Sequence, residues 1–157
     1  MRIGITGHTN LTDGTAEAIY AALLAELSAA GPGLIGVTCL ADGADQLFAR
    51  AVDAVGGTYE VILPAPDYRR LVAPDRRDDF DTLLAAAATV VPTGERHAGR
   101  RAYVAANHIM LARVDRLLAV WDGHDHGPPG GTADVVTRAR AAALPLKVIW
   151  PAGARRA

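Results

Sequence analysis

The sequence predicts an α/β protein with a Rossmann-like, doubly wound fold: a mostly parallel sheet of about six strands with helices on both faces. Short runs that are apolar throughout recur along the chain. Such runs are typical of strands buried on both faces. Segments of helical periodicity separate them, and the two kinds alternate strictly. Strict alternation joined by right-handed crossovers produces a parallel sheet covered on both sides.

Each element has its own signal in the chain. The strands are expected where the short apolar runs lie, and they cover 2–6, 34–38, 59–63, 88–91, 116–121 and 146–150. The helices are expected where apolar residues recur on one face, and they cover 15–30, 44–55, 75–88, 100–113 and 133–143. The apolar face consists of Ile19, Leu23, Leu24 and Leu27 in the first helix and of Leu47, Phe48, Ala51 and Val55 in the second.

Length and composition limit the class of protein. A chain of 157 residues is long enough for one full core, so we expect a single domain over 1–157. The formal net charge is −1. Because electrostatic attachment to nucleic acid usually requires a basic surplus, we expect no nucleic-acid partner. No apolar stretch reaches the ~20 residues of a membrane span and no signal peptide is visible, so we expect no membrane association. Cys39 is the only cysteine, which fits a reducing cytoplasm.

Three polar or glycine-rich loops follow expected strands, at 6–10, 39–45 and 121–134. The carboxyl ends of parallel strands meet at one edge of a sheet, where ligands of such folds bind. We therefore expect the loops to converge on one pocket. The candidate ligand-binding residues are Gly7, His8, Thr9, Asp42, Gly43, Asp45, Trp121, Gly130, Gly131 and Thr132.

Gly130 and Gly131 lie between the fifth strand and the last helix. Without Cβ atoms, the backbone turns tightly there and leaves N–H groups at a helix N-terminus free for an anion. A phosphate-bearing molecule is the ligand that this junction predicts.

Each loop also has a purely structural interpretation. The alternative for the loop at 6–10 is a tight turn before a helix capped by Thr12 or Asp13. Asp45 lies in a first helical turn, where a carboxylate is favourable without any ligand. The same holds for Asp134, the best acid–base candidate because it follows the glycine pair.

Two further polar pairs or clusters attract attention. His124, Asp125 and His126 suggest a metal site, but consecutive residues in a Gly/Pro loop lack a fixed geometry, and solvated loop residues are the simpler interpretation. We expect no metal and no cofactor. One of Asn107 and His108 is expected to face the end of the fifth strand.

Three motifs together resemble the SLOG superfamily, which includes the SMF/DprA proteins and the LOG-type phosphoribohydrolases. The run 38–45 (TCLADGAD) resembles the motif S-G-x-A-x-G-(A/I)-D, and 130–134 (GGTAD) is similar to a shortened P-G-G-x-G-T-x-x-E. The run 4–8 (GITGH) looks like the first strand and loop of that group. The resemblance implies one pocket for a nucleotide or a nucleotide-derived ligand, formed by these loops.

The leading hypothesis is therefore a domain that binds a nucleotide or a nucleotide-derived phosphate, for sensing or ligand handling. The backbone around 130–133 would hold the phosphate, Asp42 or Asp45 would contact sugar hydroxyls, and Trp121 or Tyr68 would stack on a base.

The alternative is an N-glycosidase or a nucleoside deoxyribosyltransferase. In that case Asp134, which falls on the glutamate position of the second motif, would act on C1′. The arginine of the cleaving relatives does not carry over, since Ala106 and Asn107 stand where R-K is expected. The resemblance also implies self-association, and we expect a homodimer through the alanine-rich helix 100–113.

Overall fold

The computed structural model describes residues 1–157 and contains one six-stranded sheet. All five pairings between neighbouring strands are parallel, in the order β4-β3-β2-β1-β5-β6. The strands are β1 (Arg2–Gly7), β2 (Ile35–Thr38), β3 (Thr58–Leu63), β4 (Thr89–Pro92), β5 (Arg116–Val120) and β6 (Leu146–Ile149). The predicted Rossmann-like sheet is confirmed.

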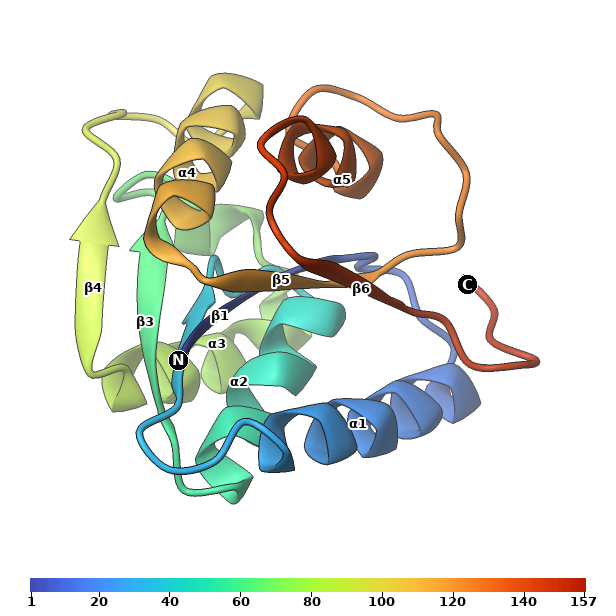
Figure 1. The fold of residues 1–157 in the computed structure, drawn as a ribbon. Coiled ribbons are helices and arrows are strands. Elements are labelled where there is room, and N and C mark those ends of the chain that lie inside the picture. Colours follow the sequence, from blue (N-terminus) through green and yellow to red (C-terminus); the bar gives the residue numbers. More distant parts are fainter.

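Helices cover both faces of the sheet (Figure 1). On one face lie α1 (Asp13–Ser28), α2 (Ala44–Ala54) and α3 (Arg77–Ala86), and on the other lie α4 (Arg100–Arg113) and α5 (Thr132–Ala141). Two short 3₁₀ helices, η1 (Tyr68–Leu71) and η2 (Pro74–Arg76), precede α3. The helix expected at 75–88 thus begins as a 3₁₀ turn at Pro74 and becomes α-helical only from Arg77, and proline suits the first position of such a turn.

The order of the strands reverses beside β1. From β1 the chain builds outward through β2, β3 and β4, and then returns through α4 to place β5 on the other side of β1. The carboxyl ends of β1 and β5 therefore flank the switch point of the sheet, where α/β folds bind ligands. The pairing with β5 continues one residue past the end of β1, because the His8 N–H donates to the Val120 carbonyl at 3.1 Å.

The larger part of the core lies between the sheet and α1 to α3, and a smaller part lies between the sheet and the helices α4 and α5. Ile3 and Ile5 of β1 and Leu118 of β5 are fully or almost fully buried in the larger part. The start of α2 packs directly on the end of β1, since a Cβ on Gly7 would lie 2.4 Å from Cβ of Ala44. This close approach brings the loop before α2 to the switch point. No helix of the chain combines the length and apolarity needed to cross a bilayer.

Candidate functional site

A cavity of about 600 Å³ opens at the carboxyl ends of the strands, around the switch point. Its walls come from the segments after β1, β2, β3 and β5, from the start of α5 and from the middle of α4. Most of the candidate residues from the sequence line it: Gly7, His8, Thr9, Asp42, Asp45, Trp121, Gly130, Gly131 and Thr132. Gly43 and Asp134 do not line it. The cavity is of a size that takes a nucleotide-sized ligand.

Gly43 holds two loops together. It precedes α2 with φ +75° and ψ −120°, and a Cβ there would lie 2.6 Å from the His8 carbonyl oxygen and 2.7 Å from that of Thr9. The next N–H, of Ala44, donates to the same His8 carbonyl at 3.2 Å. The close approach that requires glycine here is therefore between two parts of the protein itself.

The glycine loop, residues 128–131, is fixed from both sides. Gly130 has φ +84°, its N–H donates to the Asp134 carboxylate at 2.8 Å, and its carbonyl accepts from Asn107 of α4 at 3.0 Å. The Gly131 N–H donates to the Pro128 carbonyl at 3.0 Å. Of the two polar residues singled out on α4, Asn107 lines the cavity and His108 contacts Arg138 instead.

The start of α5 is left open toward the cavity. Its first intrahelical bond runs from the Val135 N–H to the Gly131 carbonyl. The N–H groups of Thr132, Ala133 and Asp134 have no acceptor in the protein, and Gly131 offers no capping side chain. Unpaired N–H groups at a helix N-terminus attract an anion through both hydrogen bonding and the helix dipole.

The Asp134 carboxylate is occupied by its own loop and helix. It accepts from the Gly130 N–H and from Arg138 Nε at 3.2 Å. The Gly130 N–H, opposed by partial burial and assisted by Arg138, holds the pKa of Asp134 below its ordinary value. These contacts keep the carboxylate charged and shape the glycine loop.

Asp45 is the other carboxyl group at a helix start, and it is only 6% exposed on the cavity wall. Burial raises the pKa of Asp45 to about 7, although the Ala41 N–H donates to it at 3.2 Å. Burial, and then the charge of Asp45, also raise the pKa of Tyr68. The Tyr68 ring packs edge-on against Phe80 and Tyr103, with centroids 5.8 and 6.0 Å away.

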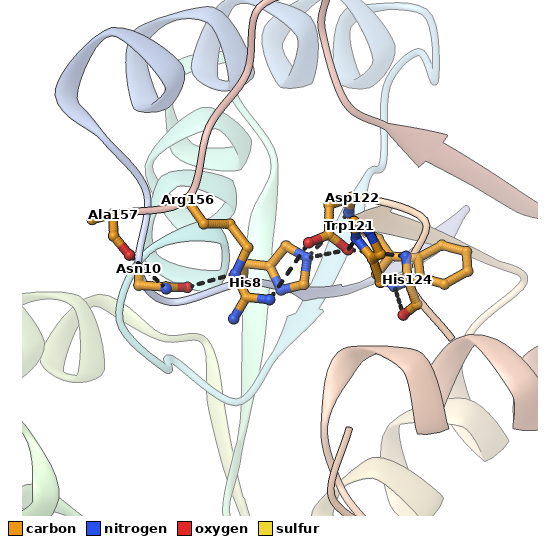
Figure 2. Close-up of polar contacts among 7 residues, drawn as sticks. All are labelled: His8, Asn10, Trp121, Asp122, His124, Arg156 and Ala157. Atoms are coloured by element: carbon orange, nitrogen blue, oxygen red, sulfur yellow. Dashed lines mark hydrogen bonds and ion pairs between the residues drawn. The ribbon is translucent and has the colours of Figure 1, made fainter. Parts of the chain in front are cut away.

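A charged cluster forms where the segment after β5 meets that after β1 (Figure 2). The Asp122 N–H donates to His8 Nε2 at 3.1 Å, which places the proton of a neutral His8 on Nδ1. Burial and then Arg156 lower the pKa of His8. Burial opposes ionisation of Asp122, but the backbone and side chain of His124 and the nearby His8 overcome it and lower the pKa of Asp122 to about 2.

Arg156 completes this cluster from the end of the chain. Its Nε donates to the Asn10 side chain at 3.0 Å and its Nη1 lies 3.5 Å from the Asp122 carboxylate (Figure 2). Asp122 and Arg156 were not among the residues singled out from the sequence. Asp122 lies two positions after the end of β5 and so had a local signal, whereas Arg156 lies 34 positions further along the chain and had none.

Trp121 is packed rather than open. It is 5% exposed, its indole N–H donates to the His124 carbonyl at 3.1 Å, and the guanidinium of Arg140 lies 5.5 Å from the ring centroid. One face and the polar edge of the ring are thus already in contact with the protein. No group of three or more His, Cys, Asp or Glu side chains is arranged to hold a metal ion.

Solved structures with a similar fold were found. DNA processing protein A from Streptococcus pneumoniae aligns with a TM-score of 0.72 at 13% identity, over 97% of this chain and 51% of that chain. DNA processing protein A from Helicobacter pylori, whose structure concerns single-stranded DNA binding, aligns with a TM-score of 0.68 at 16% identity. The alignment covers 98% of this chain and 67% of that one. The molybdenum cofactor binding protein from Rippkaea orientalis aligns with a TM-score of 0.60 at 18% identity, over 94% of this chain and 74% of that chain.

At such low sequence identity the similarity concerns the fold alone. This chain spans about half the length of the first of these proteins. No protein-family model matches the sequence, and no curated protein matches it.

The expectation of no nucleic-acid partner is wrong as an inference from composition. The similar structures include a protein that binds single-stranded DNA. Net charge averages over the whole surface, whereas nucleic acid is bound by local groups that a near-neutral chain also carries. Absence of a basic surplus therefore excludes nothing for this fold. The chain shares the fold of these solved structures, and the three sequence motifs predicted such a fold.

Proposed function

We propose that this protein binds a nucleotide or a nucleotide-derived phosphate in the cavity at the switch point. The observation that carries the proposal is the open start of α5, where three backbone N–H groups have no acceptor. Two of their residues, Thr132 and Ala133, line a cavity of about 600 Å³. A phosphate accepts several hydrogen bonds at once and carries the charge that the helix dipole favours.

The remainder of the cavity suits the sugar and base of such a ligand. Asp42 and Asp45 line it from the segment after β2, and carboxyl groups accept hydrogen bonds from sugar hydroxyls. Thr9 and Asn107 add further polar groups from two other walls. Sensing or handling of this ligand is the task we assign to the protein.

The alternative, an N-glycosidase or deoxyribosyltransferase acting through Asp134, has less support. That carboxylate bonds to Gly130 and Arg138, and it is not part of the cavity lining. A residue that attacks or stabilises C1′ must reach the sugar. The cytoplasmic location and the homodimer remain predictions from the sequence.

Replacing Thr132 with proline tests the phosphate site. Proline removes one N–H and is well tolerated at the first helical position, and Gly131, with φ −78° and ψ 175°, already has the extended conformation required before proline. Thr132→Val is the matched control, because it removes the hydroxyl and keeps the N–H. We expect Thr132→Pro to weaken nucleotide binding about tenfold or more, the value of one lost hydrogen bond to a charged group.

Isothermal titration with the mono- and diphosphates of adenosine, guanosine, cytidine and uridine measures the affinities, and thermal unfolding verifies the fold of each variant. Equal affinities of Thr132→Pro and Thr132→Val would contradict the phosphate position. A wild-type protein that binds none of these nucleotides would refute the proposed function.

A further inference from the structure

The end of the chain contributes a side chain to the cavity, and the structure holds it in place firmly. After β6 the segment 151–157 returns to the loop after β1, where Arg156 forms an antiparallel bridge with Leu11. The Ala157 N–H donates to the Asn10 carbonyl at 2.7 Å, and the Asn10 side chain donates back to the Ala157 carbonyl at 3.2 Å. The backbone on both sides of Arg156 is therefore fixed against the wall of the cavity.

The neighbouring residue secures the same segment. The Arg155 N–H donates to the Thr15 hydroxyl at 2.7 Å, and the Arg155 carbonyl accepts from the Thr12 N–H at 3.3 Å. The side chain of Arg155 makes no hydrogen bond, and it does not line the cavity. Only the second of two adjacent arginines is aimed at the site.

Arg156 is also the only lysine or arginine that lines the cavity. Three carboxyl groups, Asp42, Asp45 and Asp122, share the lining with it. An anionic ligand entering this space therefore meets one permanent positive side chain. The guanidinium has five N–H donors, and its partners in the protein occupy only Nε and, at 3.5 Å, Nη1. Donors at Nη2 remain free for a ligand.

The two groups that favour an anion are held by different parts of the fold. The start of α5 is positioned through the glycine loop by Asn107 of α4 and by Asp134. Arg156 is positioned by Asn10, which follows β1, and by Asp122, which follows β5 (Figure 2). Both groups line the same cavity.

Building on the proposed function, we infer that Arg156 binds a second anionic group of the ligand, apart from the phosphate at α5. The ligand class is then a nucleotide with two anionic groups, such as a nucleoside diphosphate, rather than a nucleoside monophosphate. When such a ligand binds, the free Nη2 donors of the guanidinium form a charge-assisted hydrogen bond to it.

Comparison of mono- and diphosphate binding in arginine variants tests this inference. Arg156→Gln removes the charge, Arg156→Lys keeps a charge without the planar fork, and Arg155→Gln is the matched control with the same change of net charge in the same segment. We expect Arg156→Gln to lower the affinity for the best-bound diphosphate about tenfold and that for its monophosphate by less than about threefold. Arg156→Lys should fall between wild type and Arg156→Gln, and Arg155→Gln should match the wild type.

The outcomes separate the two proposals. Equal losses for mono- and diphosphate in Arg156→Gln, or no loss beyond that of Arg155→Gln, overturn the role of Arg156. If Thr132→Pro still weakens nucleotide binding in that case, the proposed function stands without a role for Arg156. Absence of binding to every nucleotide by the wild type overturns both. Equal unfolding temperatures of the Arg156 and Arg155 variants exclude a general loss of structure.

Discussion

Two helices begin at the cavity with the same local pattern and opposite electrostatics. Both α2 and α5 follow a glycine, and both carry an aspartate in the first turn that accepts a hydrogen bond from the N–H four residues earlier. Yet burial raises the pKa of Asp45 to about 7, whereas Gly130 and Arg138 lower the pKa of Asp134. The same sequence signal therefore precedes a carboxyl group with a pKa near 7, Asp45, and a carboxylate that stays charged, Asp134.

The surroundings of the two helix starts explain this difference. The first N–H of α2 is taken by the His8 carbonyl, and the helix start is pressed against β1. The first three N–H groups of α5 remain unpaired, and Asp134 has a cation one helical turn away. One helix start is used to join two loops and the other is available for a ligand.

The largest contrast is expected from alanine at two of the glycines with positive φ, Gly43 before α2 and Gly130 before α5. Gly43→Ala should destabilise the protein by about 3 kcal/mol or more, because the new Cβ would overlap two backbone carbonyl oxygens in a conformation that suits glycine alone. Gly130→Ala should cost about 1–2 kcal/mol, since its Cβ would meet Cβ of Tyr103 at 3.1 Å.

Gly123→Ala is the control for strain without contact. Its φ is +86° and a Cβ there would meet nothing within 4 Å, so this variant should lose about 1 kcal/mol of unfolding free energy. Urea unfolding of the three variants measures the order. A Gly43→Ala variant no less stable than Gly123→Ala would contradict the tight junction of the two loops.

The next effect concerns the pH dependence of stability at Asp45. Because its pKa rises from 3.8 to about 7 on folding, the folded state keeps a proton that the unfolded state has lost. Stability should therefore fall as the pH rises from about 4 to about 7. Asp45→Asn keeps an acceptor for Ala41 and removes the charge, so it should be more stable than wild type above pH 7, by about 1–3 kcal/mol.

This gain should disappear near pH 4, where both proteins are uncharged at this position. Denaturant unfolding at pH 4, 6 and 8 provides the comparison. A gain of the same size at all three values would mean that burial of the charge is not its cause.

Asp134→Asn should give the smallest effect and the opposite sign. A lowered pKa contributes stability that is present above the ordinary value of 3.8 and lost as the pH falls through the lower folded value. At pH 7 the variant should lose no more than ~1 kcal/mol, because asparagine still accepts from Gly130. Nucleotide affinity should stay or rise, since a carboxylate near the phosphate is gone.

The same variant separates binding from hydrolysis. If Asp134 were the catalytic carboxylate, release of free base from nucleoside monophosphates would fall at least roughly 100-fold in the variant. Chromatography of the incubated nucleotides detects that release. Binding without turnover in either protein favours the binding function, and turnover that depends on Asp134 would overturn it.

The fold was predictable from the sequence because its signals are local. Short apolar runs marked all six strands, and the alternation with helices implied the parallel sheet. The glycine loop and the position of α5 behind it followed from adjacent residues as well. The predicted boundaries of the helices were less accurate where another local structure competes with the α-helix, as at Pro74, which begins a 3₁₀ turn before α3.

The sequence by itself determined the sheet, its order of elements and the loops that meet at its edge, since periodicity and glycine positions depend on near neighbours in the chain. Only the tertiary structure decided that Asp45 is buried, that Asp134 binds its own loop, and that Arg156 joins Asp122 from 34 residues away. Burial and ion pairing depend on distant segments that fold against each other, and no pattern of adjacent residues records those contacts.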